Sequence, residues 1–163
     1  MMTPVRAMAL AAGVMLAAPV FVAAQTPPEG QAAPPSYRPG LGDLMTTTVQ
    51  PRHIKLGLAG REKNWAYAAY ELHEMEEAFD RLSIQWPQWQ RLRIVELVET
   101  MIREPMYDLG QAIKEKNESK YLVAYGHVTD ACNACHQAAR RQFVVIQEPK
   151  DPMFPDQDFR PKP

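Results

Sequence analysis

The sequence lacks a strong charge of either sign and has few residues that bind metals. Its 163 residues include 18 Lys and Arg against 19 Asp and Glu, a net charge of -1, so no concentrated basic surface indicates a nucleic-acid-binding protein. Two cysteines and four histidines are few for a structural zinc site, which needs about four ligands. After residue 24, no segment is apolar over the ~20 residues that a membrane-spanning helix needs. No internal repeat is present either.

The first 24 residues have the pattern of a secretory signal peptide. Arg6 supplies a positive charge, an apolar run follows from Ala7 to Val20, and small residues then suit cleavage after Ala24. The apolar run is shorter than a membrane span, although an uncleaved anchor is the alternative interpretation. The residue directly after the cleavage position is not a cysteine, which argues against a lipoprotein. The pattern predicts export to the periplasm and removal of residues 1–24.

Proline is concentrated towards the two ends of the chain. Residues 25–40 are rich in proline and have no apolar periodicity, which predicts a flexible linker. The segment from Glu148 to Pro163 has the same character, so we expect a disordered tail outside the core. Residues 41–147, between these two segments, are the predicted folded domain.

Apolar residues recur at intervals of three and four along this domain, in four successive segments. The second is the clearest, and its stripe consists of Trp65, Ala68, Leu72, Met75, Phe79 and Leu82. Asn64 precedes it as a good N-cap residue, and the opposite face, which includes Glu71, is expected to be solvated. The other segments are about Leu41–Ala59, the stretch after Trp86, and about Ser119–Ile146.

Prolines interrupt two of these helical segments. At Pro51 the first helix either bends or begins anew, and Pro105 should kink the third because a proline inside a helix loses a backbone hydrogen bond. No segment has the alternating pattern of a strand. The sequence therefore predicts an all-α protein, an antiparallel up-down-up-down four-helix bundle.

The string Cys132-Asn133-Ala134-Cys135-His136 is the motif that indicates chemistry. Two thiols three residues apart on one helix face can reach the two vinyl groups of one haem, and the next histidine can point at the iron. A thioredoxin-like pair would prefer a helix N-terminus after a strand, and a disulfide within one helical turn would be strained. The motif predicts one covalently bound haem c, attached through Cys132 and Cys135, with His136 as an axial iron ligand.

A signal peptide, four helices and this motif near the C-terminus resemble the class II cytochromes c, the group of cytochrome c-prime and its low-spin, methionine-ligated relatives. The resemblance covers about Leu41–Gln147. The family tends to have the pattern CxxCHxxYR, and this sequence keeps the arginine as Arg140 but has Ala139 in place of the tyrosine. The resemblance implies that Arg140 lies beside the proximal histidine, and that two subunits can form a homodimer.

The second axial position decides the function that the resemblance implies. Counted back from the Ala59-Gly60 turn, the family's distal position falls at about Leu44 or Met45. Met45 as a ligand would give a closed iron suited to electron transfer, whereas an open iron would bind NO or CO. His53 is a third candidate, and Met45 as a core residue is the alternative to ligation. We expect an electron carrier and not an enzyme, with a redox partner that the sequence does not name.

Overall fold

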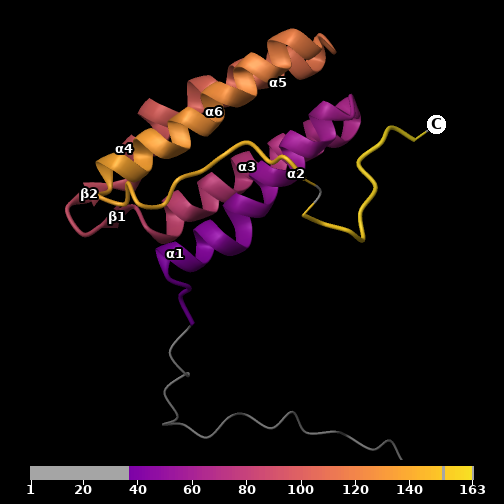
Figure 1. The fold of residues 1–163 in the computed structure, drawn as a ribbon. Helices are drawn as coiled ribbons and strands as arrows, with labels where there is room; N and C mark the ends of the chain where they lie inside the picture. The colour runs from indigo at the N-terminus through magenta and orange to yellow at the C-terminus, as the bar shows by residue number, and fades with distance from the viewer. Residues whose placement is uncertain (1–36, 152, 163) are drawn as a thin grey trace, which may run out of the picture. The chain divides into compact units, whose positions relative to one another are not determined.

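The computed structural model describes residues 37–151 and 153–162. The expected signal peptide, 1–24, and most of the expected linker, 25–40, lie outside the described residues. The described chain is mainly helical (Figure 1), which confirms the all-α class. Its α-helices are α1 Leu41–Leu44, α2 Gln50–Arg61, α3 Trp65–Gln85, α4 Ile94–Leu97, α5 Arg103–Lys114 and α6 Glu118–Ala138. None of these helices is long and apolar enough to cross a membrane.

A small antiparallel hairpin is the only sheet in the described part of the chain. Strand β1, Gln88–Trp89, pairs with β2, Leu92–Arg93. It follows the break at Trp86 and Pro87 and leads directly into α4. No alternating pattern marks these strands because each is only two residues long.

Two π-helical turns connect the short helices to the long ones, and each precedes a proline. Met45–Val49 joins α1 to α2, and Val98–Ile102 joins α4 to α5. Pro51 and Pro105 lack the N–H that would pair with the carbonyl four residues earlier, and these carbonyls, of Thr47 and Met101, lie inside the two turns. The helix therefore continues through each proline instead of ending there.

The helices pack in two pairs, α2 with α3 and α5 with α6, and further contacts join α3 to α5 and α2 to α6 (Figure 1). Fully buried side chains fill the space between them, the largest being Tyr121, Tyr125, Leu56, Met75, Leu82, Ile102, Met106 and Leu109. Two glycines of α2 allow its close approach to α6. A Cβ atom on Gly57 would meet the Tyr125 hydroxyl, and one on Gly60 would overlap the Tyr121 ring.

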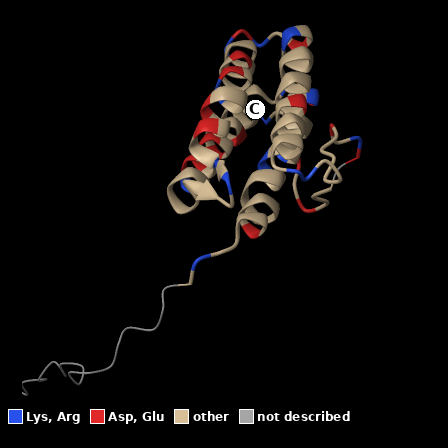
Figure 2. Ribbon diagram, turned by 90° about the vertical axis from the view of Figure 1, so that its left-hand side faces the viewer, with Lys and Arg blue, Asp and Glu red and all other residues tan. Residues whose placement is uncertain are grey.

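The expectation that Glu71 is solvated is wrong. Its side chain is 1% exposed and lies 3.2 Å from the guanidinium of Arg52, which also pairs with Glu74 at 3.0 Å. Acidic residues gather along the left-hand helices of the view in Figure 2. Because α2 packs against α3, this face of α3 is covered at Glu71, where Arg52 compensates the buried carboxylate. Further along the same face, Glu77 and Arg81 are exposed.

The expectation that the segment Glu148–Pro163 lies outside the core is also wrong for Pro149 and Phe159, which are buried, while its other described residues are exposed or half-buried. Phe159 is 6% exposed and stacks on the Tyr67 ring at 5.5 Å between centroids. The Tyr67 hydroxyl donates to Gln157 at 2.9 Å, and Arg61 donates to the carbonyl of the buried Pro149. The segment has no helical period, but its aromatic and carbonyl groups find partners on α2 and α3.

Candidate functional site

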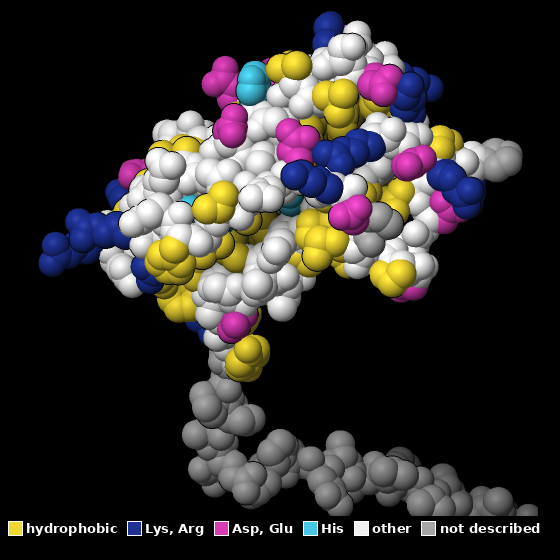
Figure 3. Space-filling view, viewed as in Figure 1, with side chains coloured by type: hydrophobic (Ala, Val, Ile, Leu, Met, Phe, Trp, Pro, Cys, Tyr) yellow, Lys and Arg dark blue, Asp and Glu magenta, His cyan; other side chains and the backbone are white. Residues whose placement is uncertain are grey.

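An apolar cavity of about 420 Å³ lies where the first helical residues meet the end of α6. Its walls come from four places that are far apart in the sequence: residues 41–53, Phe79 of α3, the hairpin with the following helix, and residues 132–146. Apolar side chains gather at the left-hand end of the molecule in Figure 3, where Figure 1 has α1, β1 and β2. The cavity brings together all four sequence-predicted site residues, Met45, Cys132, Cys135 and His136.

The two cysteines are free thiols on the cavity side of α6. Cys132 is buried and Cys135 is half-buried. Burial raises the pKa of Cys132 to about 12 and also raises the pKa of Cys135. A thiol pair that exchanges disulfides needs the opposite, a lowered pKa that favours the thiolate. The site therefore does not have the electrostatics of a thioredoxin-like pair.

His136 is held in a single orientation by a backbone carbonyl. Its Nδ1 lies 2.8 Å from the carbonyl oxygen of Val144, and because a carbonyl can only accept, Nδ1 must carry the proton. A neutral imidazole protonated at Nδ1 has its free lone pair on Nε2. This arrangement, with the second ring nitrogen bound to a carbonyl, is the usual one for a histidine that binds a metal ion.

The chain turns back after α6, which sequence periodicity did not predict. We expected a helix to Ile146, but α6 ends at Ala138, and Arg140 adopts a positive φ of 54°. The returning segment lies against α6, and Asn133 contacts it through two hydrogen bonds. Its Oδ1 accepts from the Ile146 N–H at 2.8 Å, and its Nδ2 donates to the Ile146 carbonyl at 2.9 Å. No sequence pattern identifies this contact.

Met45 and Leu44 differ in position although they are adjacent. Met45 is half-buried and lines the cavity, whereas Leu44 is 7% exposed and belongs to the core without lining the cavity. Of the two residues at the expected distal position, the one with a thioether therefore lines the same cavity as the other site residues.

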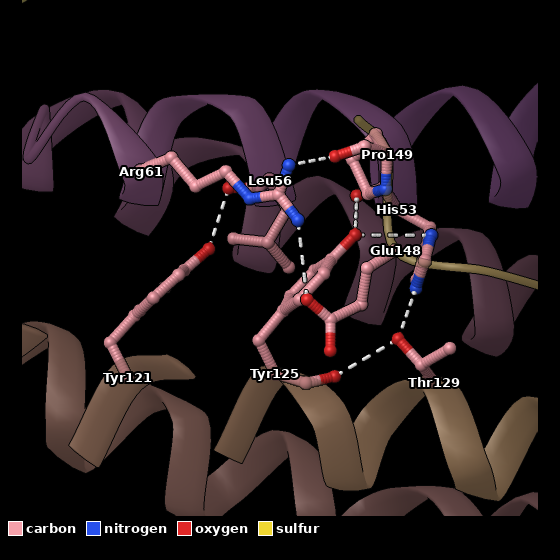
Figure 4. A network of polar contacts seen from close by, with 8 residues as sticks. All are labelled: His53, Leu56, Arg61, Tyr121, Tyr125, Thr129, Glu148 and Pro149. Carbon is pink, nitrogen blue, oxygen red and sulfur yellow. Dashed lines mark hydrogen bonds and ion pairs between the residues drawn. The ribbon is translucent and has the colours of Figure 1, made fainter. Parts of the chain in front are cut away.

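His53 also lines the cavity, but both of its ring nitrogens have partners (Figure 4). Nε2 lies 2.9 Å from the Thr129 hydroxyl, and Nδ1 lies 3.2 Å from the Tyr125 hydroxyl, which donates to the His53 carbonyl at 2.8 Å. The ring is 3% exposed, and burial lowers its pKa to about 4. A nitrogen of His53 could bind iron only after one of these hydrogen bonds is broken.

A cationic and aromatic rim adjoins the cavity. The Arg141 guanidinium lies 5.0 Å from the centre of the Trp89 ring and 5.9 Å from that of Phe143, and all three residues line the cavity. Arg140, which the resemblance put beside the histidine, is exposed and is not among the lining residues. The arginine at the cavity is therefore the next one in the sequence.

The residues present fit a covalently bound haem. Two thiols, an imidazole with a free Nε2 and a thioether surround an apolar cavity whose volume is within the usual range for small-molecule and cofactor sites. Within residues 37–151 and 153–162, no three His, Cys, Asp or Glu side chains converge to hold a metal ion without such a group. Comparisons with protein-family models, curated proteins and solved structures give no match for this chain.

Proposed function

We propose that this protein is a c-type cytochrome that carries electrons. The observation that carries the proposal is that Cys132, Cys135, His136 and Met45 line the same apolar cavity. Thioether bonds from the two cysteines would attach one haem, and Nε2 of His136 would be an axial ligand. When bound, the haem iron supplies a one-electron couple, so the protein itself needs no acid, base or nucleophile.

Within that class, we assign the chain to the class II cytochromes c, with an up-down-up-down bundle. The pairing of α2 with α3 and of α5 with α6 supports this topology, as does a cavity formed by the first and last helical segments. The signal-like residues 1–24 support a periplasmic location. Pairing of two subunits, which the family implies, is part of this proposal.

In this proposal the thioether of Met45 would be the second protein ligand of the iron. Its side chain lines the cavity, whereas His53 is engaged at both ring nitrogens. A thioether is a soft donor that favours ferrous iron and raises the reduction potential, and it closes the iron to small gases. The cavity interior around it is apolar, which also favours the state of lower charge.

Covalent attachment is tested first, on the exported full-length chain. Acid-acetone extraction should leave the haem on the protein, and denaturing gels should stain for haem. Changing Cys132 or Cys135 to Ala should leave a single thioether or haem-free protein. Haem extracted freely from the wild type would refute the c-type assignment.

The sixth ligand is tested with Met45→Leu, which preserves side-chain volume while removing the sulfur. The wild type should show the weak sulfur-to-iron charge-transfer band and bind CO slowly. The variant should lose the band, have a lower potential and bind CO rapidly. Met75→Leu is the control, because Met75 is fully buried in α3 away from the cavity. A wild type that is high-spin and binds CO at once would instead be a gas-binding protein, and a change caused only by His53→Gln would indicate bis-histidine ligation.

A further inference from the structure

Asn133, between the two cysteines, pairs with the backbone as a hydrogen-bonded residue pair in an antiparallel sheet does. Its side-chain amide donates to and accepts from the same residue, Ile146, with lengths of 2.9 and 2.8 Å. The side-chain amide has the same donor and acceptor groups as a peptide unit. Two bonds to one residue fix the orientation of the partner backbone as well as its distance, and both contacts are partly buried.

This contact determines where the Val144 carbonyl lies. Residues 145–150 form no helix or strand, so side chains of other elements must hold the segment in place. The Val144 N–H bonds to the Arg141 carbonyl at 2.8 Å in a local turn, and Asn133 fixes the chain two residues further on. Between these two anchors, the Val144 carbonyl accepts from Nδ1 of His136.

We propose that Asn133 is a positioning residue that sets the donor strength of His136, an inference that rests on the haem function proposed above. By holding Ile146, Asn133 keeps the Val144 carbonyl on the Nδ1–H of His136. A carbonyl on this N–H makes the imidazole a more basic ligand at Nε2. A more basic ligand favours ferric iron, so Asn133 lowers the reduction potential without contacting His136.

The test compares Asn133→Leu, which preserves the shape but removes both hydrogen bonds, with the wild type as haem-loaded full chains. Hydrogen exchange at the Ile146 amide, followed by NMR, measures how strongly the hydrogen bonds to residue 133 hold the segment in place. Loss of a hydrogen bond of ordinary net strength should make this exchange about tenfold faster. The reduction potential depends on the donor strength of His136, and it should rise in the variant. Gln137→Leu is the matched control, because Gln137 is exposed one turn further along α6, and it should change neither readout.

Asn133→Asp is the second variant, useful if Asn133→Leu does not take up haem. Its carboxylate can still accept from the Ile146 N–H but cannot donate to the carbonyl. The amide should stay protected, and the added negative charge should lower the potential, opposite to the effect of leucine. Rapid exchange in the aspartate variant would overturn the proposal.

In Asn133→Leu the exchange rate and the reduction potential must change together. Rapid exchange with an unchanged potential in Asn133→Leu would overturn the proposal, because Asn133 would then hold the segment without acting on His136. A raised potential with a protected amide would overturn it as well. Failure of the haem function is recognised separately, because the wild type would then carry no covalent haem.

Discussion

Protonation of His53 should destabilise the fold in mild acid. Burial lowers its pKa from 6.5 to about 4, because an imidazolium ion loses its hydration inside the protein. The Tyr125 and Thr129 hydroxyls can donate to the His53 and Tyr125 carbonyls and still accept from the ring, so hydrogen bonding does not oppose the extra proton. The penalty therefore comes from desolvation.

The sign and size of this effect follow from the two pKa values. The unfolded chain binds the proton below about pH 6.5, whereas the native state binds it only near pH 4. Stability is therefore fully present above pH 6.5 and is lost as the pH falls towards 4. The loss integrated to pH 4 is about 3 kcal/mol, which corresponds to roughly 10 °C in Tm for a domain of this size.

The measurement compares the wild type with His53→Gln by urea and thermal unfolding at pH 7 and pH 4. Glutamine can form hydrogen bonds but cannot titrate, so the variant should lose about 3 kcal/mol less between the two pH values, whatever its stability at pH 7. His73→Gln is the control, since His73 is 65% exposed, and it should behave as the wild type does. Equal acid losses in the wild type and His53→Gln would refute the argument.

Two further predictions concern packing and are measured by urea unfolding. Gly60→Ala should destabilise by about 3 kcal/mol because the new methyl overlaps the buried Tyr121 ring. Gly126→Ala, whose Cβ would lie 3.6 Å from the nearest atom, should instead stabilise α6 by about 0.5–1 kcal/mol; similar effects in both would contradict the close approach of α2 to α6. Phe159→Ala should cost about 3 kcal/mol by removing the stack on Tyr67, and no loss would mean that the C-terminal segment adds nothing to stability.

A helix end could be predicted from the sequence where a neighbouring residue, such as an N-cap, determines it. The helix after Asn64 begins as expected, and the Asn64 side chain accepts from the Tyr67 N–H at 3.2 Å. The end of α6 could not be predicted in this way. No glycine or proline lies between Ala138 and Ile146, and Phe143 continues the apolar period, so only the contacts of the returning segment with Asn133 and His136 distinguish a turn from more helix.

The same distinction applies to the candidate site. Cys132, Cys135 and His136 could be grouped from the sequence because the proposed haem attachment has a fixed local spacing, and the expected order of helices added Met45. The structure shows that all four line one cavity. The Val144 carbonyl, the partners of His53 and the position of Arg141 could not be recognised. Each depends on a contact between separate elements; Thr129 and His53, for example, are 76 residues apart.

The cavity has one wall from residues 41–53 and another from residues 132–146, near opposite ends of the described chain. Closing a loop of that length has an entropic cost that grows slowly with its size, but the cost comes before any contact across the cavity can form. The site therefore has no precursor in any single helix, hairpin or helix pair. The pocket therefore forms only when the whole domain folds. A ligand that binds both walls would provide the contacts between the two most distant segments, which form last.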